Sequence, residues 1–271
     1  LRVLDSQGSG STDNVARAID YAVEQGADVI NLSFVGSGKS LTLEKAIKNA
    51  YEQGVLVVAA AGNEIDRGEN LIKGEVEAYP VCHDGPNGEN WVIGVASVDS
   101  ENKLASFSNY GDCIDIVAPG VGIYSSVYQN EQKSDFLNYY LGGWAGTSVS
   151  TPQVAGAAAL IKSFKPDLSL NQIRNLLLDN AKNIDSLNTV YIGKLGKGLL
   201  DVYTSVSRSV DTIPTKDVPK SKLVTVAGVG GGPHVKVLRK DYLESEFFAF
   251  DDSWRGGVSV AYGDLEGDGS R

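Results

Sequence analysis

The sequence predicts an α/β fold with a mostly parallel sheet, followed by a short all-β segment at the C-terminal end. Up to about residue 207, apolar runs rich in β-branched residues alternate with amphipathic helical segments. This alternation is typical of right-handed βαβ units. Beyond a polar stretch spaced by prolines, the chain contains only short strand-like runs separated by glycine turns.

The first elements follow one another in a regular order. Apolar residues at helical spacing over residues 15–23 predict a helix. A strand over residues 28–33 comes next, and a second amphipathic helix covers residues 43–50. A glycine follows each helix and is its natural stop. The repeated unit therefore predicts parallel neighbouring strands.

Residues 54–63 form an apolar run that ends in small residues and an amide, Ala-Ala-Ala-Gly-Asn. A strand that is buried on both faces has this composition. Asn63 therefore falls at the carboxyl end of a strand, where α/β folds place their ligands. A turn residue after a core strand is the alternative interpretation.

Residues 146–160 place Ser148 between a small-residue turn and an apolar helix. Pro152 fits the first turn of that helix, because its missing N–H has no partner there. The helix start offers free N–H groups and a positive dipole end beside Ser148, and such groups can stabilise an oxyanion. The alternative is a packed helix whose serine only caps it.

The remaining elements of the α/β part are two helices after a break at Lys165-Pro166-Asp167. Ser169 and Gln172 form a capping-box pattern that opens the first, which runs to Asn180. Residues 199–203 lead into a last helix that ends near Val210. Residues 64–90 are polar and glycine-rich, as long surface loops are.

The strand ending in Ala-Ala-Gly-Asn and the Gly-Thr-Ser helix together closely resemble the subtilases, the subtilisin-like serine proteases. Four further segments match in family order: residues 28–33, 105–111, 114–120 and 196–201. The resemblance covers roughly residues 1–206. It implies a subtilisin-like three-layer fold with a mostly parallel sheet and a catalytic domain over residues 1–207.

The resemblance also implies roles for particular residues. Ser148 would be the nucleophile of a serine endopeptidase that forms an acyl-enzyme, and Asn63 would donate its side-chain amide to the oxyanion. No cofactor would be needed for catalysis, and the partner would be a polypeptide substrate. The substrate would contact an edge segment, a pocket wall and the residue before the nucleophile: Ser33, Phe34, Val35 and Gly36; Ala60, Ala61 and Gly62; and Thr147.

The walls of small residues leave room for a large apolar or aromatic substrate side chain. However, Phe34 and Val35 stand where many subtilases carry smaller residues, so the pocket departs from the family pattern. The alternative for both segments is ordinary packing at strand ends. Gln153 occupies a position where subtilases often have a noncatalytic histidine.

The general base and its carboxylate are missing from the matched motifs. Subtilases supply them from an Asp-Gly motif and a His-Gly-Thr-His motif placed before the strand that residues 1–4 resemble. The two histidines, His83 and His234, lack this context. The chain starts with Leu1 inside an expected strand and contains no methionine. We therefore expect a fragment cut at both ends, with a sheet incomplete at its N-terminus and little activity alone.

A second function class remains open at this point. A noncatalytic secreted adhesion or binding protein could carry a decayed protease-like domain. The presence of both Ser148 and Asn63 favours the enzyme, because decay would not be expected to spare both residues.

The C-terminal part has a different character. Residues 208–222 form a proline-spaced linker. Residues 223–271 resemble one partial blade of an FG-GAP type β-propeller repeat, with strands predicted around 224–228, 234–238, 247–250 and 258–261. By this resemblance a structural calcium ion would bind the acidic loop, and the repeat would bind an extracellular protein or glycan. The acidic residues are Asp264, Glu266 and Asp268. An ordinary acidic turn is the alternative.

Composition narrows the remaining classes. The formal net charge of −10 argues against nucleic acid or an anionic membrane as a partner. No apolar run approaches the roughly 18 residues of a membrane span.

By resemblance, Cys82 and Cys113 lie in loops at the two ends of the strand over residues 91–95, which implies a disulfide; two buried free thiols are the alternative. An even cysteine count fits an oxidising compartment and a secreted or cell-surface protein. The resemblance also makes Tyr79-Pro80 a candidate cis peptide.

Overall fold

A computed structural model describes residues 1–36, 38–64, 68–86, 88–127, 140–209, 223–226, 234–239 and 242–248. The chain divides into two compact units, Leu1–Asp211 and Thr212–Arg271. The first unit contains the parallel sheet and all of the described helices. Each unit is described by itself.

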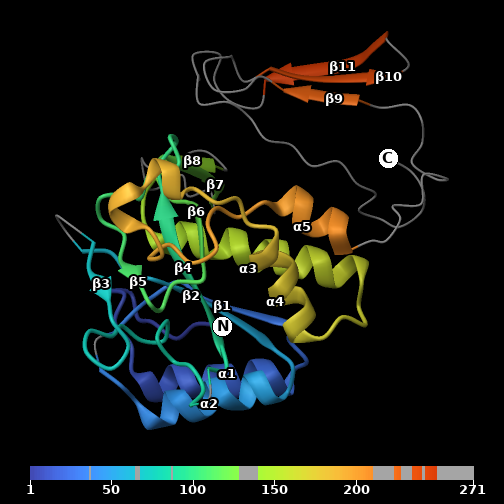
Figure 1. Cartoon of the computed structure of the whole chain (residues 1–271). Coiled ribbons are helices and arrows are strands. Elements are labelled where there is room, and N and C mark those ends of the chain that lie inside the picture. Colours follow the sequence, from blue (N-terminus) through green and yellow to red (C-terminus); the bar gives the residue numbers. More distant parts are fainter. Residues whose placement is uncertain are drawn as a thin grey trace. The chain divides into compact units, whose positions relative to one another are not determined.

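A four-stranded parallel sheet with the order β1-β2-β4-β6 forms the centre of the first unit (Figure 1). Every residue of the two central strands is buried. Their valine, isoleucine and alanine side chains can face helices on both sides without leaving a polar group unpaired. The bounds are Val29–Leu32 for β1, Leu56–Ala60 for β2, Val92–Val98 for β4 and Ile116–Pro119 for β6.

Helices cover both faces of this sheet, as Figure 1 shows. One apolar core lies between the sheet and helices α1 and α2, and a second core lies between the sheet and α3 with α4. The predicted α/β fold with a parallel sheet is confirmed. The helices are α1 Thr12–Glu24, α2 Leu41–Glu52, α3 Thr147–Phe164, α4 Leu170–Asp179 and α5 Val202–Ser209.

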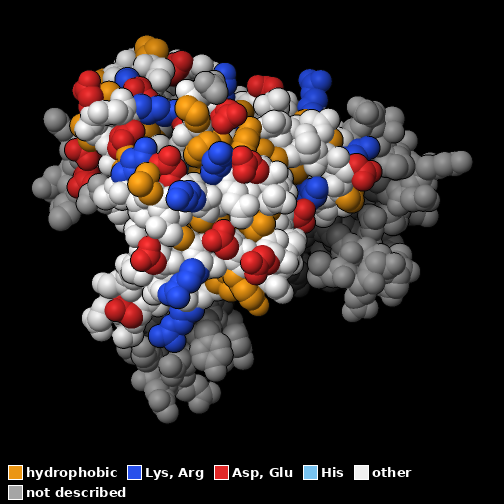
Figure 2. Space-filling view, turned by 90° about the horizontal axis from the view of Figure 1, so that it is seen from below, with side chains coloured by type: hydrophobic (Ala, Val, Ile, Leu, Met, Phe, Trp, Pro, Cys, Tyr) orange, Lys and Arg blue, Asp and Glu red, His pale blue; other side chains and the backbone are white. Residues whose placement is uncertain are grey.

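The outer face of α1 and α2 is charged with both signs. Figure 2 shows acidic and basic side chains interspersed on this face, with hydrophobic side chains between them. Lys48 and Glu52 form an exposed ion pair one turn apart on α2. Within the described residues, no helix combines the length and apolar character needed to cross a membrane.

The helix starts differ in how their first N–H groups are capped. Serines cap α1, α2 and α4 with their hydroxyls, and the predicted capping box between Ser169 and Gln172 is present at α4. Helix α3 begins after Gly146 and has no side-chain cap. Its first turn is instead held by other contacts: the Thr147 N–H donates to the Asn63 side chain and the Val149 N–H donates to Gly146 O. The N–H of Ser148 has no hydrogen-bond partner among the described residues.

Short elements complete the first unit. Strand β3 (Asn70–Leu71) pairs with β5 (Tyr110–Gly111), and β7 (Ile123–Ser126) pairs with β8 (Tyr140–Trp144). Strand β8 ends two residues before α3 begins. Two 3₁₀ helices, Asp185–Leu187 and Thr189–Tyr191, precede α5.

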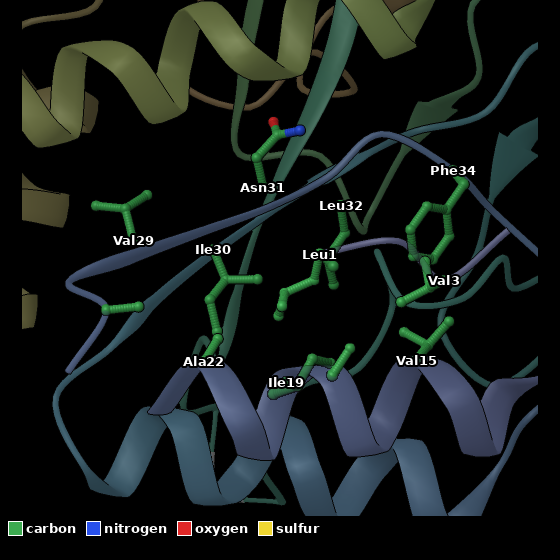
Figure 3. Close-up of a pocket in the computed structure, with 12 residues that line it drawn as sticks. Leu1, Val3, Val15, Ile19, Ala22, Val29, Ile30, Asn31, Leu32 and Phe34 are labelled. Atoms are coloured by element: carbon green, nitrogen blue, oxygen red, sulfur yellow. The ribbon is translucent and has the colours of Figure 1, made fainter. Parts of the chain in front are cut away.

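The prediction of a strand over residues 1–4 is wrong for this structure. These residues form no strand, and the Leu1 side chain is 78% exposed. A strand requires a hydrogen-bonded neighbour, and no described strand pairs with them. β1 is an edge of the parallel sheet, and a pocket of about 270 Å³ lies between it, α1 and the N-terminal residues (Figure 3).

Two covalent features fix the loops around β4. Cys82 and Cys113 are joined by a disulfide with an S–S distance of 2.10 Å. The peptide bond between Tyr79 and Pro80 is cis. Both features lie where the resemblance implied them.

The second unit contains a three-stranded antiparallel sheet with β10 in the middle. The strands are β9 Leu223–Val226, β10 His234–Arg239 and β11 Tyr242–Phe248. The third strand, β11, begins five residues before the predicted 247–250, because it pairs with β10 along its whole length, from Tyr242 to Phe248. The fourth predicted strand and the acidic residues Asp264, Glu266 and Asp268 lie outside the described residues.

Candidate active site

Ser148 lies in the first turn of α3, and its side chain is exposed. Its Oγ donates a hydrogen bond to the backbone oxygen of Ser33, at 2.9 Å. Gly146, which precedes the helix, has φ +146, and a Cβ there would lie 3.1 Å from the Asn63 amide nitrogen. This position therefore favours glycine, because a side chain would crowd Asn63 and strain the backbone.

Two donors on one oxygen fix the Asn63 amide. The backbone N–H and the hydroxyl of Thr147 both donate to Asn63 Oδ1, at 2.9 Å and 3.0 Å. An amide oxygen accepts and an amide nitrogen donates, so these bonds define which end is which. Asn63 Nδ2 has no hydrogen-bond partner among the described residues. It is therefore available as a donor beside Ser148.

The backbone before Asn63 is held from two sides. The N–H of Gly62 donates to the Thr147 hydroxyl at 3.1 Å. On the other side, Asn109 donates its side-chain amide to Ala61 O at 3.1 Å and its backbone N–H to Gly62 O at 3.1 Å. Asn109 is only 2% exposed. The position of Asn63 thus depends on contacts with distant parts of the chain.

Buried hydroxyls attach the start of α3 to the carboxyl end of β6. Ser150 Oγ lies 3.0 Å from the backbone oxygens of Ala118 and Pro119 and 2.8 Å from Ser97 Oγ. The Gln153 side chain donates to Pro119 O at 2.7 Å. These contacts fix the helix that carries Ser148.

Sequence reasoning missed the supporting roles of Asn109, Ser97 and Ser150. Each acts through a partner at least 11 positions away in the chain. For Asn109 the sequence offered only its place in the segment 105–111, which matched the family without indicating a role.

The predicted edge segment, residues 33–36, contacts Ser148 at one end and the loop with the cis-proline at the other. Ser33 O accepts the Ser148 hydroxyl, and Gly36 exchanges two backbone hydrogen bonds with Tyr79, at 2.7 Å and 2.8 Å. Phe34 lines the pocket of Figure 3 with Val3 and Val15. Its side chain therefore belongs to this pocket, whereas the predicted contact of residues 33–36 with substrate is made by their backbone.

The predicted pocket wall is closed to solvent. Ala60, Ala61 and Gly62 are all buried. Of the residues predicted to contact substrate, the structure brings Ser33 and Thr147 next to Ser148 and Asn63, and it places Val35 against Gly62.

Among the described residues, His83 forms no hydrogen bond with Ser148, Asn63 or Thr147. It is 2% exposed, its ring lies 4.5 Å from that of Tyr79 between centroids with the planes tilted by 42°, and its Nδ1 lies 4.0 Å from a Glu44 oxygen. Burial lowers the pKa of the His83 imidazole to about 4, so the ring is neutral near pH 7. His234 lies on β10, in the second unit. The described part of the chain contains no group of three or more acidic, histidine or cysteine residues arranged to hold a metal ion.

Comparisons with known proteins agree with this architecture. The model of the subtilase family matches residues 1–210. The chain is 41% identical over 202 residues to Subtilisin DY of Bacillus licheniformis, covering 74% of this chain and 65% of that one. It is 40% identical over 188 residues to Subtilisin Savinase of Lederbergia lenta, covering 69% and 61%.

Solved structures show the same likeness. A protease from Pseudoalteromonas arctica superposes with a TM-score of 0.63 at 33% identity, covering 77% of this chain and 62% of that one. A cold-adapted subtilisin-like serine proteinase superposes with a TM-score of 0.56 at 29% identity, covering 74% and 63%. The chain thus spans less than two thirds of the length of these relatives. The sequence matches and the shared fold show that the chain belongs to the subtilase family, the subtilisin-like serine proteases.

Proposed function

We propose that the protein is a serine endopeptidase that hydrolyses peptide bonds through an acyl-enzyme on Ser148. The observation that carries the proposal is the orientation of Asn63, whose amide nitrogen is left free beside the exposed Ser148 hydroxyl. The backbone N–H of Ser148, in the first turn of α3, adds a second donor beside it. This combination of donors suits an oxyanion that forms when Ser148 attacks a carbonyl.

In the proposed reaction, Ser148 Oγ bonds to the substrate carbonyl carbon and the carbonyl oxygen becomes an oxyanion. Asn63 Nδ2 and the backbone N–H of Ser148 donate to that oxygen. Collapse of the tetrahedral intermediate breaks the peptide bond and releases the amine, and water then hydrolyses the acyl-enzyme. The substrate binds as an extended strand along residues 33–36, since peptides commonly add to an exposed backbone edge.

A base must take the proton of Ser148, and the Ser33 carbonyl that accepts it here is not basic enough to do so. We propose that a histidine and its carboxylate reside in a part of the protein outside these 271 residues. The match covers 65% of Subtilisin DY, so part of that relative has no counterpart in this chain. His83 is unsuited to the role because it is buried against Tyr79.

The test is hydrolysis of a chromogenic peptide by the protein at its natural full length. Ser148→Ala should abolish turnover. Asn63→Leu removes the oxyanion donor and should lower kcat by roughly 10²–10³ with little change in KM, because the interaction forms only in the transition state. A folded protein that cleaves no peptide, or retains activity in Ser148→Ala, would contradict the proposal and favour a noncatalytic binding protein.

We also propose that the protein is secreted or displayed at the cell surface. The disulfide between Cys82 and Cys113 supports this, because such bonds persist in oxidising compartments. The test is the redox state of these cysteines in protein taken from the culture medium, compared with protein from cell extract.

For the second unit we propose an FG-GAP type propeller repeat that binds calcium and an extracellular protein or glycan. Three consecutive antiparallel strands are compatible with part of a four-stranded blade. The proposed ligands are Asp264, Glu266 and Asp268. Calorimetric titration with calcium tests this, and binding that survives Asp264→Asn together with Asp268→Asn would contradict it.

A further inference from the structure

We propose that Val35 makes the pocket for the substrate side chain before the scissile bond a narrow one, suited to glycine or alanine. This inference rests on the proposed endopeptidase function and names its substrate class. It reverses the expectation, drawn from the small wall residues alone, of room for a large apolar or aromatic side chain.

The direction of Val35 follows from its contacts, which differ from those of Phe34. Phe34 points into the pocket beneath β1, beside Val3 and Val15 (Figure 3). Gly36 is held in antiparallel pairing with Tyr79. Val35 instead lies against Gly62, the residue before Asn63.

Val35 reaches across to the opposite wall. A Cβ built on Gly62 would lie 2.8 Å from the buried Asn109 amide nitrogen, and 3.2 Å and 3.6 Å from the two methyl carbons of Val35. Gly62 is buried even though its neighbour Asn63 is exposed. Both methyl groups therefore occupy the space in front of Gly62, where a substrate side chain would have to enter.

Neither wall can easily move apart. Gly62 is fixed by the Thr147 hydroxyl at its N–H and by Asn109 at its carbonyl. Val35 is β-branched, so its χ1 angle has few alternatives. Its own backbone lies between two anchored neighbours, Ser33 and Gly36.

The consequence is steric selection. Val35 is 42% exposed, so its isopropyl group stands at the entrance of the gap and is not part of the core. The hydrogen atom of glycine or the methyl group of alanine fits beside it, whereas a benzyl group would overlap the two methyl carbons. Discrimination by a few methyl groups in an apolar pocket is commonly roughly 10–200-fold.

The experiment compares two chromogenic peptides that differ only in alanine or phenylalanine before the scissile bond. We expect the full-length protein to have the higher kcat/KM for the alanine peptide. Val35→Gly should raise the phenylalanine-to-alanine ratio by roughly 10–200-fold. Val35→Ala should fall between, and Val35→Thr, which keeps the volume, should leave the ratio unchanged.

Val121→Gly is the matched control for the flexibility that glycine introduces, because Val121 has the same exposed fraction of 42%. It should leave the ratio unchanged. A preference of the unaltered protein for the phenylalanine peptide, or an unchanged ratio in Val35→Gly, would overturn the inference.

A binding readout keeps the inference testable if the protein proves inactive. Phenol is titrated into ¹⁵N-labelled protein, and the amide signal of Gly62 is followed. The signal should move in Val35→Gly and stay in place in the unaltered protein. An equal response of both proteins, or none in Val35→Gly, overturns the inference. Absent turnover together with the expected shifts would reject the proposed function alone.

Discussion

Replacing Thr147 with valine is expected to lower the free energy of unfolding by about 2–4 kcal/mol. The substitution keeps the shape of the side chain and removes only the hydroxyl. Two interactions are lost: the donation to Asn63 Oδ1 at 3.0 Å and the acceptance from Gly62 N–H at 3.1 Å. A typical hydrogen bond contributes about 1 kcal/mol net, and an unpaired buried N–H costs about 1–3 kcal/mol.

Urea unfolding followed by the fluorescence of Trp91, which is buried in the first unit, measures this change. Thr147→Ser is the control, because it keeps the hydroxyl and loses one methyl group, worth about 1 kcal/mol. Thr147→Val should also lower kcat, by less than the roughly 10²–10³ expected for losing Asn63 itself, since the backbone N–H of Thr147 still holds Asn63. If Thr147→Val is no less stable than Thr147→Ser, the reasoning is refuted.

Three further predictions concern the disulfide, a buried histidine and a buried amide. Reducing the bond between Cys82 and Cys113, which are 31 positions apart, should lower the stability by about 4 kcal/mol, measured as a lower urea midpoint in dithiothreitol; an unchanged midpoint contradicts this. Burial depresses the pKa of His83 from 6.5 to about 4, so the folded protein binds this proton less readily than the unfolded chain does. The resulting stability is fully present above pH 6.5 and is lost, by up to about 3 kcal/mol, as the pH falls through 4. Urea unfolding between pH 7 and pH 4 should show this loss relative to a His83→Phe variant, and parallel curves would refute it. Asn109→Ala and Asn188→Ala remove amides of similar burial, 2% and 4% exposed, so both variants should be less stable. Only Asn109→Ala should lower kcat/KM, because Asn109 holds the backbone before Asn63. Equal peptide hydrolysis by the two variants would contradict this role of Asn109.

The regular elements of the first unit were predictable because local pattern and tertiary packing agree there. The run that ends at Asn63 reads as a doubly buried strand and forms β2. The pattern from Ser169 to Gln172 forms the capping box of α4, and the apolar run after Ser148 forms α3 up to Phe164. In each case the residues carry the signal within one or two turns or one strand.

The parts that could not be predicted depend on contacts between distant segments. No local pattern shows that Asn109 would donate to Ala61, or that the Thr147 hydroxyl would hold Gly62. The contact of Val35 with Gly62 also joins two distant segments. The catalytic and substrate-binding roles of individual residues stay predictions.

Residues 1–4 failed for a related reason. They resemble a strand of the family, but strand formation requires a partner, and β1 receives none on its outer edge among the described residues. The resemblance identified the segment and could not show whether it pairs.

The most direct test of the central claim is labelling of the full-length protein with a fluorophosphonate probe, followed by mass spectrometry of the modified peptide. Such probes react with a serine whose hydroxyl is activated by a base and whose product is held in an oxyanion site. The account predicts modification of Ser148 that disappears in Ser148→Ala and is strongly slowed in Asn63→Leu. A folded protein that carries no label at Ser148 would contradict it.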